Sequence, residues 1–69
     1  MLRLKFERTN RQISQTRLAL VAGLHQPVVS AIERGSLNPT PEQLQKLADV
    51  FRVRPTDLLK DVAVLGPSR

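Results

Sequence analysis

Few side chains in this sequence could carry out catalysis or bind a metal ion. The chain has one histidine, His25, no cysteine, and six aspartate and glutamate residues that are spread along its length. It contains no Ser/His/Asp or Cys/His grouping and no glycine-rich phosphate loop, and a metal site needs about three or four protein ligands. We therefore expect no enzyme, no metal and no cofactor. The chemistry that remains is hydrogen bonding and charge.

Positive charge is the strongest feature of the composition. The chain has eleven Lys and Arg residues but six Asp and Glu residues, so the net charge is +5 and the pI is about 11.2. A pI above about 9 is typical of nucleic-acid-binding domains, although basic solvated faces and membrane-surface proteins share it. With two Phe and no Trp or Tyr, the chain is poorly suited to stack on single-stranded nucleic acid.

The length and the apolar pattern predict one small helical domain. No apolar run approaches the roughly 18 residues of a membrane span, and the N-terminus lacks the apolar region of a secretory signal, so we expect a cytoplasmic protein without a membrane partner. Apolar residues recur at helical spacing between glycine and proline breaks. The sequence predicts an all-α fold, a compact five-helix bundle, with a domain over 1–60 and a C-terminal tail over 61–69. The helices are expected at about residues 2–10, 15–22, 26–34, 41–51 and 55–59.

Local signals define most helix ends. Ser14 is a good N-cap, and Gly23 and Gly35 suit left-handed helix ends. Thr40 and Gln43 have the spacing of a capping box. The first helix is ambiguous, because Leu2, Leu4 and Phe6 alternate as in a strand, but a lone strand there would have no partner. In the tail, Val62, Val64 and Leu65 are candidates for covering either the core or a dimer seam.

The centre of the chain matches a helix, a short glycine-containing turn and a second helix, which is the DNA-binding helix-turn-helix unit. Ala19 must be small because the second helix crosses it closely, and Gly23 makes the turn. The expected inner residues of the first of these helices are Leu18, Ala19 and Ala22, with Val21 as a further candidate; Leu24, Val29 and Ile32 fill the angle between the two. The outward positions at the start of the second helix, where base edges are contacted in such units, are Gln26, Pro27, Ser30 and Ala31.

Over about residues 4–59 the sequence resembles the Cro and lambda-type repressor family, also called the xenobiotic-response-element (XRE) family. The matching residues are Ser14, Gln15, Leu18, Ala19, Gly23, Leu24, residues 29–35, Asn38, Pro39, Leu44, Leu47, Ala48, Phe51, Val53, Leu58 and Leu59. The resemblance implies a lambda-repressor-like five-helix domain that binds double-stranded DNA as a homodimer on a palindromic or near-palindromic operator. It also implies half-sites about one helical turn apart.

The resemblance assigns roles by position. Gln26 would be the main base reader, since glutamine can pair with adenine through two hydrogen bonds, and Pro27 would offer an apolar surface to a thymine methyl. Arg8 and Glu33 would form an internal structural pair. The resemblance implies phosphate contacts for Gln15, Arg34, Ser36 and Asn38. We also expect phosphate contacts from Arg17 and His25, although these two positions do not follow the family pattern.

Three positions depart from the family pattern. The family usually has glycine where Gln12 stands, Ser or Thr where His25 stands, and an acid where Arg17 stands. Arg17 near a helix N-terminus opposes the helix dipole, and a nearby phosphate would reverse that penalty. The helix expected at about 26–34 begins with residues that are less polar than usual, so we expect recognition of DNA shape to supply part of the specificity.

Three functions remain open. The first is a transcriptional regulator, with repression and control of its own gene as the expected outcome. The second is the controller protein of a restriction–modification system, which can activate as well as repress. The third is an antitoxin that binds DNA and also neutralises a toxin partner, for which the segment from Asp61 to Arg69 is short.

Overall fold

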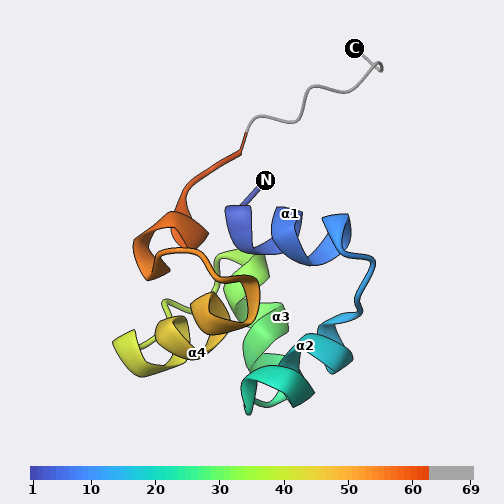
Figure 1. Cartoon of the computed structure of the whole chain (residues 1–69). Coiled ribbons are helices and arrows are strands. Elements are labelled where there is room, and N and C mark those ends of the chain that lie inside the picture. Colours follow the sequence, from blue (N-terminus) through green and yellow to red (C-terminus); the bar gives the residue numbers. More distant parts are fainter. Residues whose placement is uncertain (63–69) are drawn as a thin grey trace.

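The computed structural model describes residues 1–62, which fold into four α-helices and one 3-10 helix (Figure 1). Val64, Leu65 and the rest of the predicted tail beyond residue 62 lie outside the described residues. Within the described part, no helix is long and apolar enough to cross a membrane. The elements are α1 (Arg3–Asn10), α2 (Gln15–Ala22), α3 (Gln26–Arg34), α4 (Pro41–Phe51) and the 3-10 helix η1 (Pro55–Leu59).

The fifth predicted element is therefore a 3-10 helix and not an α-helix. The Asp57 amide donates to Arg54 O at 2.9 Å and the Lys60 amide donates to Asp57 O at 3.2 Å. These are bonds between residues three apart, which define the tighter helix and are common in short connecting pieces. The segment Pro55–Leu59 has five residues and is followed by an extended Lys60, so it is too short to gain much from bonds four residues apart.

The predicted helix ends are confirmed where a cap was visible in the sequence. The Ser14 hydroxyl accepts a hydrogen bond from the Arg17 amide at 2.9 Å. Thr40 and Gln43 form the reciprocal capping box, with distances of 3.1 and 3.0 Å. Gly23 and Gly35 end α2 and α3 with φ values of 75° and 79°, in the left-handed region that glycine enters at low cost.

Every helix contributes one apolar face to the core. α2 packs against both α3 and α4, while η1 packs against α1 and α4. Val21, a candidate for the inner face of α2, was the wrong choice, because its side chain is 57% exposed. Leu24 is half-buried against the core. The buried apolar residues are Leu4, Leu18, Ala19, Ala22, Val29, Ile32, Leu47, Ala48, Phe51 and Leu58.

The two ends of the described chain lie side by side (Figure 1). Leu2 and Asp61 form an isolated antiparallel β-bridge. The Arg3 amide donates to Lys60 O at 2.7 Å, and the Val62 amide donates to Met1 O at 2.8 Å. The choice of a helix over a strand for this segment is confirmed, because α1 begins at Arg3. The pairing of Leu2, just before the helix, with Asp61 was not predicted.

Candidate nucleic-acid interface

The α2–turn–α3 unit is built as the sequence predicts. Ala19 is buried, and its carbonyl accepts the Leu24 amide at 2.8 Å, just after the left-handed Gly23. Val29 and Ile32 bury one face of α3. The opposite face, which begins at Gln26, is left at the molecular surface. In the first turn of α3, Pro27 is exposed and Gln26 is half-buried.

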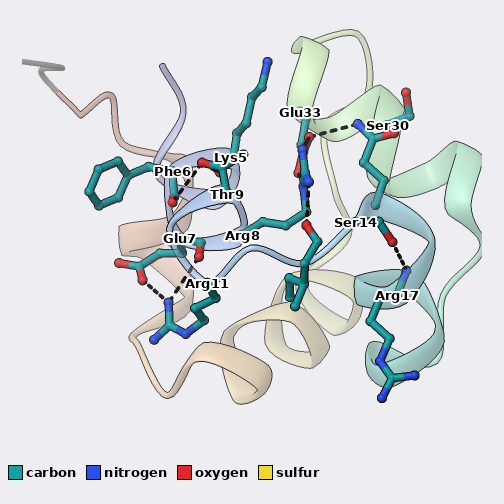
Figure 2. A network of polar contacts seen from close by, with 12 residues as sticks. Lys5, Phe6, Glu7, Arg8, Thr9, Arg11, Ser14, Arg17, Ser30 and Glu33 are labelled. Carbon is teal, nitrogen blue, oxygen red and sulfur yellow. Dashed lines mark hydrogen bonds and ion pairs between the residues drawn. The ribbon is translucent and has the colours of Figure 1, made fainter. Parts of the chain in front are cut away.

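A buried ion pair joins α1 to the end of α3. Arg8 Nε donates to Glu33 Oε2 at 2.6 Å and Arg8 Nη2 donates to Glu33 Oε1 at 3.0 Å (Figure 2). The exposed fractions of the two side chains are 12% and 2%. Because Glu33 lies at the C-terminal end of α3, the helix dipole disfavours its charge, and the Arg8 guanidinium compensates.

The same arginine also fixes the connection before α2. Arg8 Nη1 donates to the backbone carbonyl of Ile13 at 2.8 Å. Arg8 thus joins three segments of the chain: α1, the α1–α2 connection and α3. A planar guanidinium with five donors suits this task, because one side chain can bind a carboxylate and a carbonyl together.

Gln15 connects the ion pair to the predicted base reader. Its Nε2 donates to Glu33 Oε1 at 2.9 Å, and its Oε1 accepts from Gln26 Nε2 at 2.8 Å. Gln26 and Glu33 are seven residues apart, so they share one face of α3 two turns apart. We predicted a phosphate contact for Gln15 and missed this link. The spacing of residues 26 and 33 was visible, but nothing in the sequence placed a third side chain between them.

The other predicted base-reading residues lie on the same stretch of α3. Pro27 is exposed in the first turn, and Ser30 and Ala31 are half-buried. Arg34 is exposed, and its Nη1 donates to the Ser30 hydroxyl one turn earlier. The structure thus brings Arg34, predicted to contact phosphate, together with Ser30, predicted to contact a base.

The remaining predicted phosphate-contacting residues flank this surface. Arg17 is exposed in the first turn of α2, and its side chain extends away from the ion pair (Figure 2). His25 is exposed at the N-cap of α3 and makes no side-chain capping bond. In the loop after α3, Ser36 and Asn38 are exposed, and the Ser36 hydroxyl donates to Ala31 O at 3.2 Å. His25 thus lies at the start of α3, and Ser36 and Asn38 lie just after its end.

Comparison with known proteins gives consistent results. The helix-turn-helix family matches residues 4–58. The control protein C.BamHI of Bacillus amyloliquefaciens is 36% identical over 72 aligned positions, and the match covers 94% of this chain and 88% of that protein.

Two solved structures are similar in both fold and sequence. The restriction-modification controller protein C.AhdI from Aeromonas hydrophila has a TM-score of 0.76 and 35% identity, covering 83% of this chain and 86% of the other. The N-terminal DNA-binding domain of SinR from Bacillus subtilis has a TM-score of 0.77 and 33% identity, with coverage of 86% and 87%. The chain therefore belongs to the helix-turn-helix family, in its Cro and lambda-type branch of DNA-binding transcriptional regulators.

Proposed function

We propose that the protein binds a palindromic or near-palindromic operator as a homodimer and controls transcription in the manner of a restriction–modification controller. Two relatives that match at 36% and 35% identity are controller proteins, and each is covered over more than four fifths of its length. That similarity supports a controller over the other regulators of the family.

The Gln26 side chain carries the proposal. Its amide is held by Gln15 at the first turn of α3, where base edges are read in helix-turn-helix proteins. Pro27, Ser30 and Ala31 would complete the base contacts. Phosphate contacts would position the protein and make its affinity depend on salt. The groups proposed for them are Gln15, Arg17, His25, Arg34, Ser36 and Asn38.

Fluorescence anisotropy on the DNA upstream of the protein's own gene tests this function. We expect at least tenfold preference for that DNA over a scrambled duplex. Gln26→Ala should remove about 1–3 kcal/mol of that preference, the contribution of one bidentate base contact. Gln45→Ala is the matched control, because Gln45 is an exposed glutamine on α4 whose amide bonds Asp49.

Two outcomes would contradict the proposal. Equal binding of both duplexes, falling steeply with salt, would indicate purely electrostatic binding. A preference that survives Gln26→Ala would move base reading to other residues. As for the antitoxin role, no contact within residues 1–62 favours it, and we do not propose it.

A further inference from the structure

An apolar groove lies between the loop that follows α3, the end of η1 and the start of the chain. Its volume is about 290 Å³. Leu37 and Leu59 lie in its wall and are 39% and 38% exposed. Burial of such apolar surface is favourable, because it removes that surface from water. The groove therefore favours an apolar occupant. Its apolar lining residues are Leu2, Ile32, Leu37, Pro39 and Leu59.

The described part of the chain ends beside this groove. Asp61 forms its β-bridge with Leu2, which is a lining residue. The Val62 amide continues this pairing with a backbone hydrogen bond of 2.8 Å, and its side chain is half-buried. Three extended residues span at most about 10 Å, so Val64 and Leu65 lie within reach of the groove.

We propose that Val64 and Leu65 of the same chain occupy this groove. Residues 63–65 are all apolar, and Gly66 and Pro67 end that run. A segment joined by a short linker acts at an effective concentration in the millimolar range, which favours it over a partner in solution. A second copy of the chain is a poorer fit, because a stable protein interface uses about 20–30 residues on each side and the groove is much smaller.

Occupation of the groove would also support a residue proposed to contact DNA. Asn38 lies in the groove wall, in a loop that is anchored on both sides. The Leu37 amide donates to Ala31 O at 3.2 Å, and Thr40 caps α4. An apolar side chain packed against Leu37 and Pro39 would restrict Asn38 between these two anchors. This consequence rests on the phosphate contact proposed above for Asn38, whereas occupation of the groove does not.

Disulfide formation tests the occupant directly, because the chain has no cysteine of its own. Leu37→Cys combined with Leu65→Cys puts one thiol in the groove wall and one in the proposed occupant. The two can join only when their Cα atoms come within about 4.4–6.8 Å. In a glutathione buffer, with the protein at low micromolar concentration, we expect most of the variant to form a disulfide within one chain. Intact mass and non-reducing electrophoresis separate this product from a disulfide between two chains. If Leu37→Cys does not fold, as judged by circular dichroism, Leu59→Cys takes its place.

Matched variants separate occupation of the groove from simple tethering. Val64→Ser in the same background removes an apolar contact but keeps the tether, so it should lower the disulfide fraction several-fold. Ser68→Ala leaves the apolar run intact and should leave the fraction unchanged. Leu20→Cys combined with Leu65→Cys should form far less disulfide, since Leu20 is 71% exposed on α2, outside the groove.

The consequence for DNA binding has its own measurement. Val64→Ser combined with Leu65→Ser should weaken binding of the upstream DNA and of the scrambled duplex by a similar factor, because phosphate contacts carry no sequence information. In an Asn38→Ala background the same double substitution should have little further effect, since the double-mutant cycle isolates the coupling. Unchanged DNA binding in the double serine variant would overturn the support of Asn38.

Two results would overturn occupation of the groove by the same chain. The first is a disulfide between two chains, including one that joins Leu37→Cys to Leu65→Cys in a mixture of the single variants, because the occupant would then be a second copy. The second is a disulfide within one chain whose fraction Val64→Ser leaves unchanged, which would indicate tethering alone. If the disulfide forms as expected but the wild type binds no DNA, the proposed function fails and the occupation of the groove stands.

Discussion

At the scale of single residues, Gln12 is one of two non-glycine residues within 1–62 whose backbone is left-handed, the other being Arg52. Its φ is 59°, in the connection between α1 and α2. The turn is held by the Gln12 amide bonded to Thr9 O at 3.0 Å and by the Arg8 guanidinium bonded to Ile13 O at 2.8 Å. A residue with a Cβ pays about 1–2 kcal/mol in this region, whereas glycine does not. The glycine usual in the family at this position fits the backbone that the structure has.

Replacing Gln12 with glycine should therefore stabilise the protein. We expect Gln12→Gly to raise the free energy of unfolding by about 1 kcal/mol, since relief of strain exceeds the added freedom of the unfolded chain. Urea unfolding followed by circular dichroism measures the change. Lys5→Gly, an exposed position inside α1, is the control and should lose up to about 1 kcal/mol. Equal losses in both variants would show that the Gln12 side chain offsets the strain.

At the scale of elements, the N-terminus of α3 lacks the cap that α2 and α4 have. The Ser14 and Thr40 side chains accept bonds from backbone amides of their helices, but His25 accepts none. The backbone of His25, with φ −89° and ψ 144°, is already suited to an N-cap. The missing cap leaves the first turn of α3 without a bond that a hydroxyl at this position would supply.

His25→Ser should thus add a capping bond to α3. We expect the free energy of unfolding to rise by about 1 kcal/mol, measured by urea denaturation near neutral pH. Ser14→Ala provides the reverse comparison, because it removes an existing cap and should lose a similar amount. No gain from His25→Ser would indicate that the imidazole stabilises the turn in another way.

The elements also show which features can be predicted from sequence. Gly23 and the Thr40–Gln43 box give local signals, because a cap depends on residues within one turn. The Leu2–Asp61 bridge joins residues 59 positions apart, and no local pattern indicates it. The exposure of Val21 depends on how α2 is rotated against its neighbours, since a helix rich in apolar residues on all sides leaves its inner face undefined.

The same distinction between local signals and tertiary contacts applies to the candidate site. The Arg8–Glu33 pair was implied by family resemblance, and the structure brings the two together. Positions on α3 follow from helical periodicity. The link through Gln15 required the angle between α2 and α3, which is a property of tertiary packing. The DNA-contacting roles of these residues remain predictions.

At the scale of the whole molecule, a charged side chain at the end of α1, Arg11, packs against α4. Glu7 is buried and accepts a hydrogen bond from Arg3 Nε at 2.7 Å. It also accepts a hydrogen bond from Arg11 Nη1 (Figure 2). The Arg11 guanidinium also lies 4.9 Å from the centre of the Phe51 ring, which ends α4. Glu7 thus orients an arginine that packs across two helices.

The same contacts predict how stability depends on pH. The Arg11 hydrogen bond lowers the pKa of Glu7 below the usual 4.5, against an opposing effect of burial, and Arg3 lowers it further. The pKa of Asp57 is likewise lowered, chiefly by its hydrogen bond from Lys60. A carboxylate whose pKa is lower in the folded state stabilises the fold above its unfolded pKa and loses that contribution as pH falls through the folded one.

We therefore expect the free energy of unfolding to decrease as the pH falls below about 4.5, with Glu7 responsible for part of the slope. Glu7→Gln should make that part of the pH profile shallower, because the amide does not titrate. Glu42→Gln changes an exposed carboxylate whose oxygen is 3.7 Å from Lys46 Nζ and should leave the profile nearly unchanged, since exposed pairs contribute little. Urea unfolding between pH 3 and pH 7 measures all three proteins. If Glu7→Gln keeps the full wild-type slope, the acid sensitivity arises at other carboxylates, and the hydrogen bonds from Arg3 and Arg11 do not couple the ionisation of Glu7 to folding.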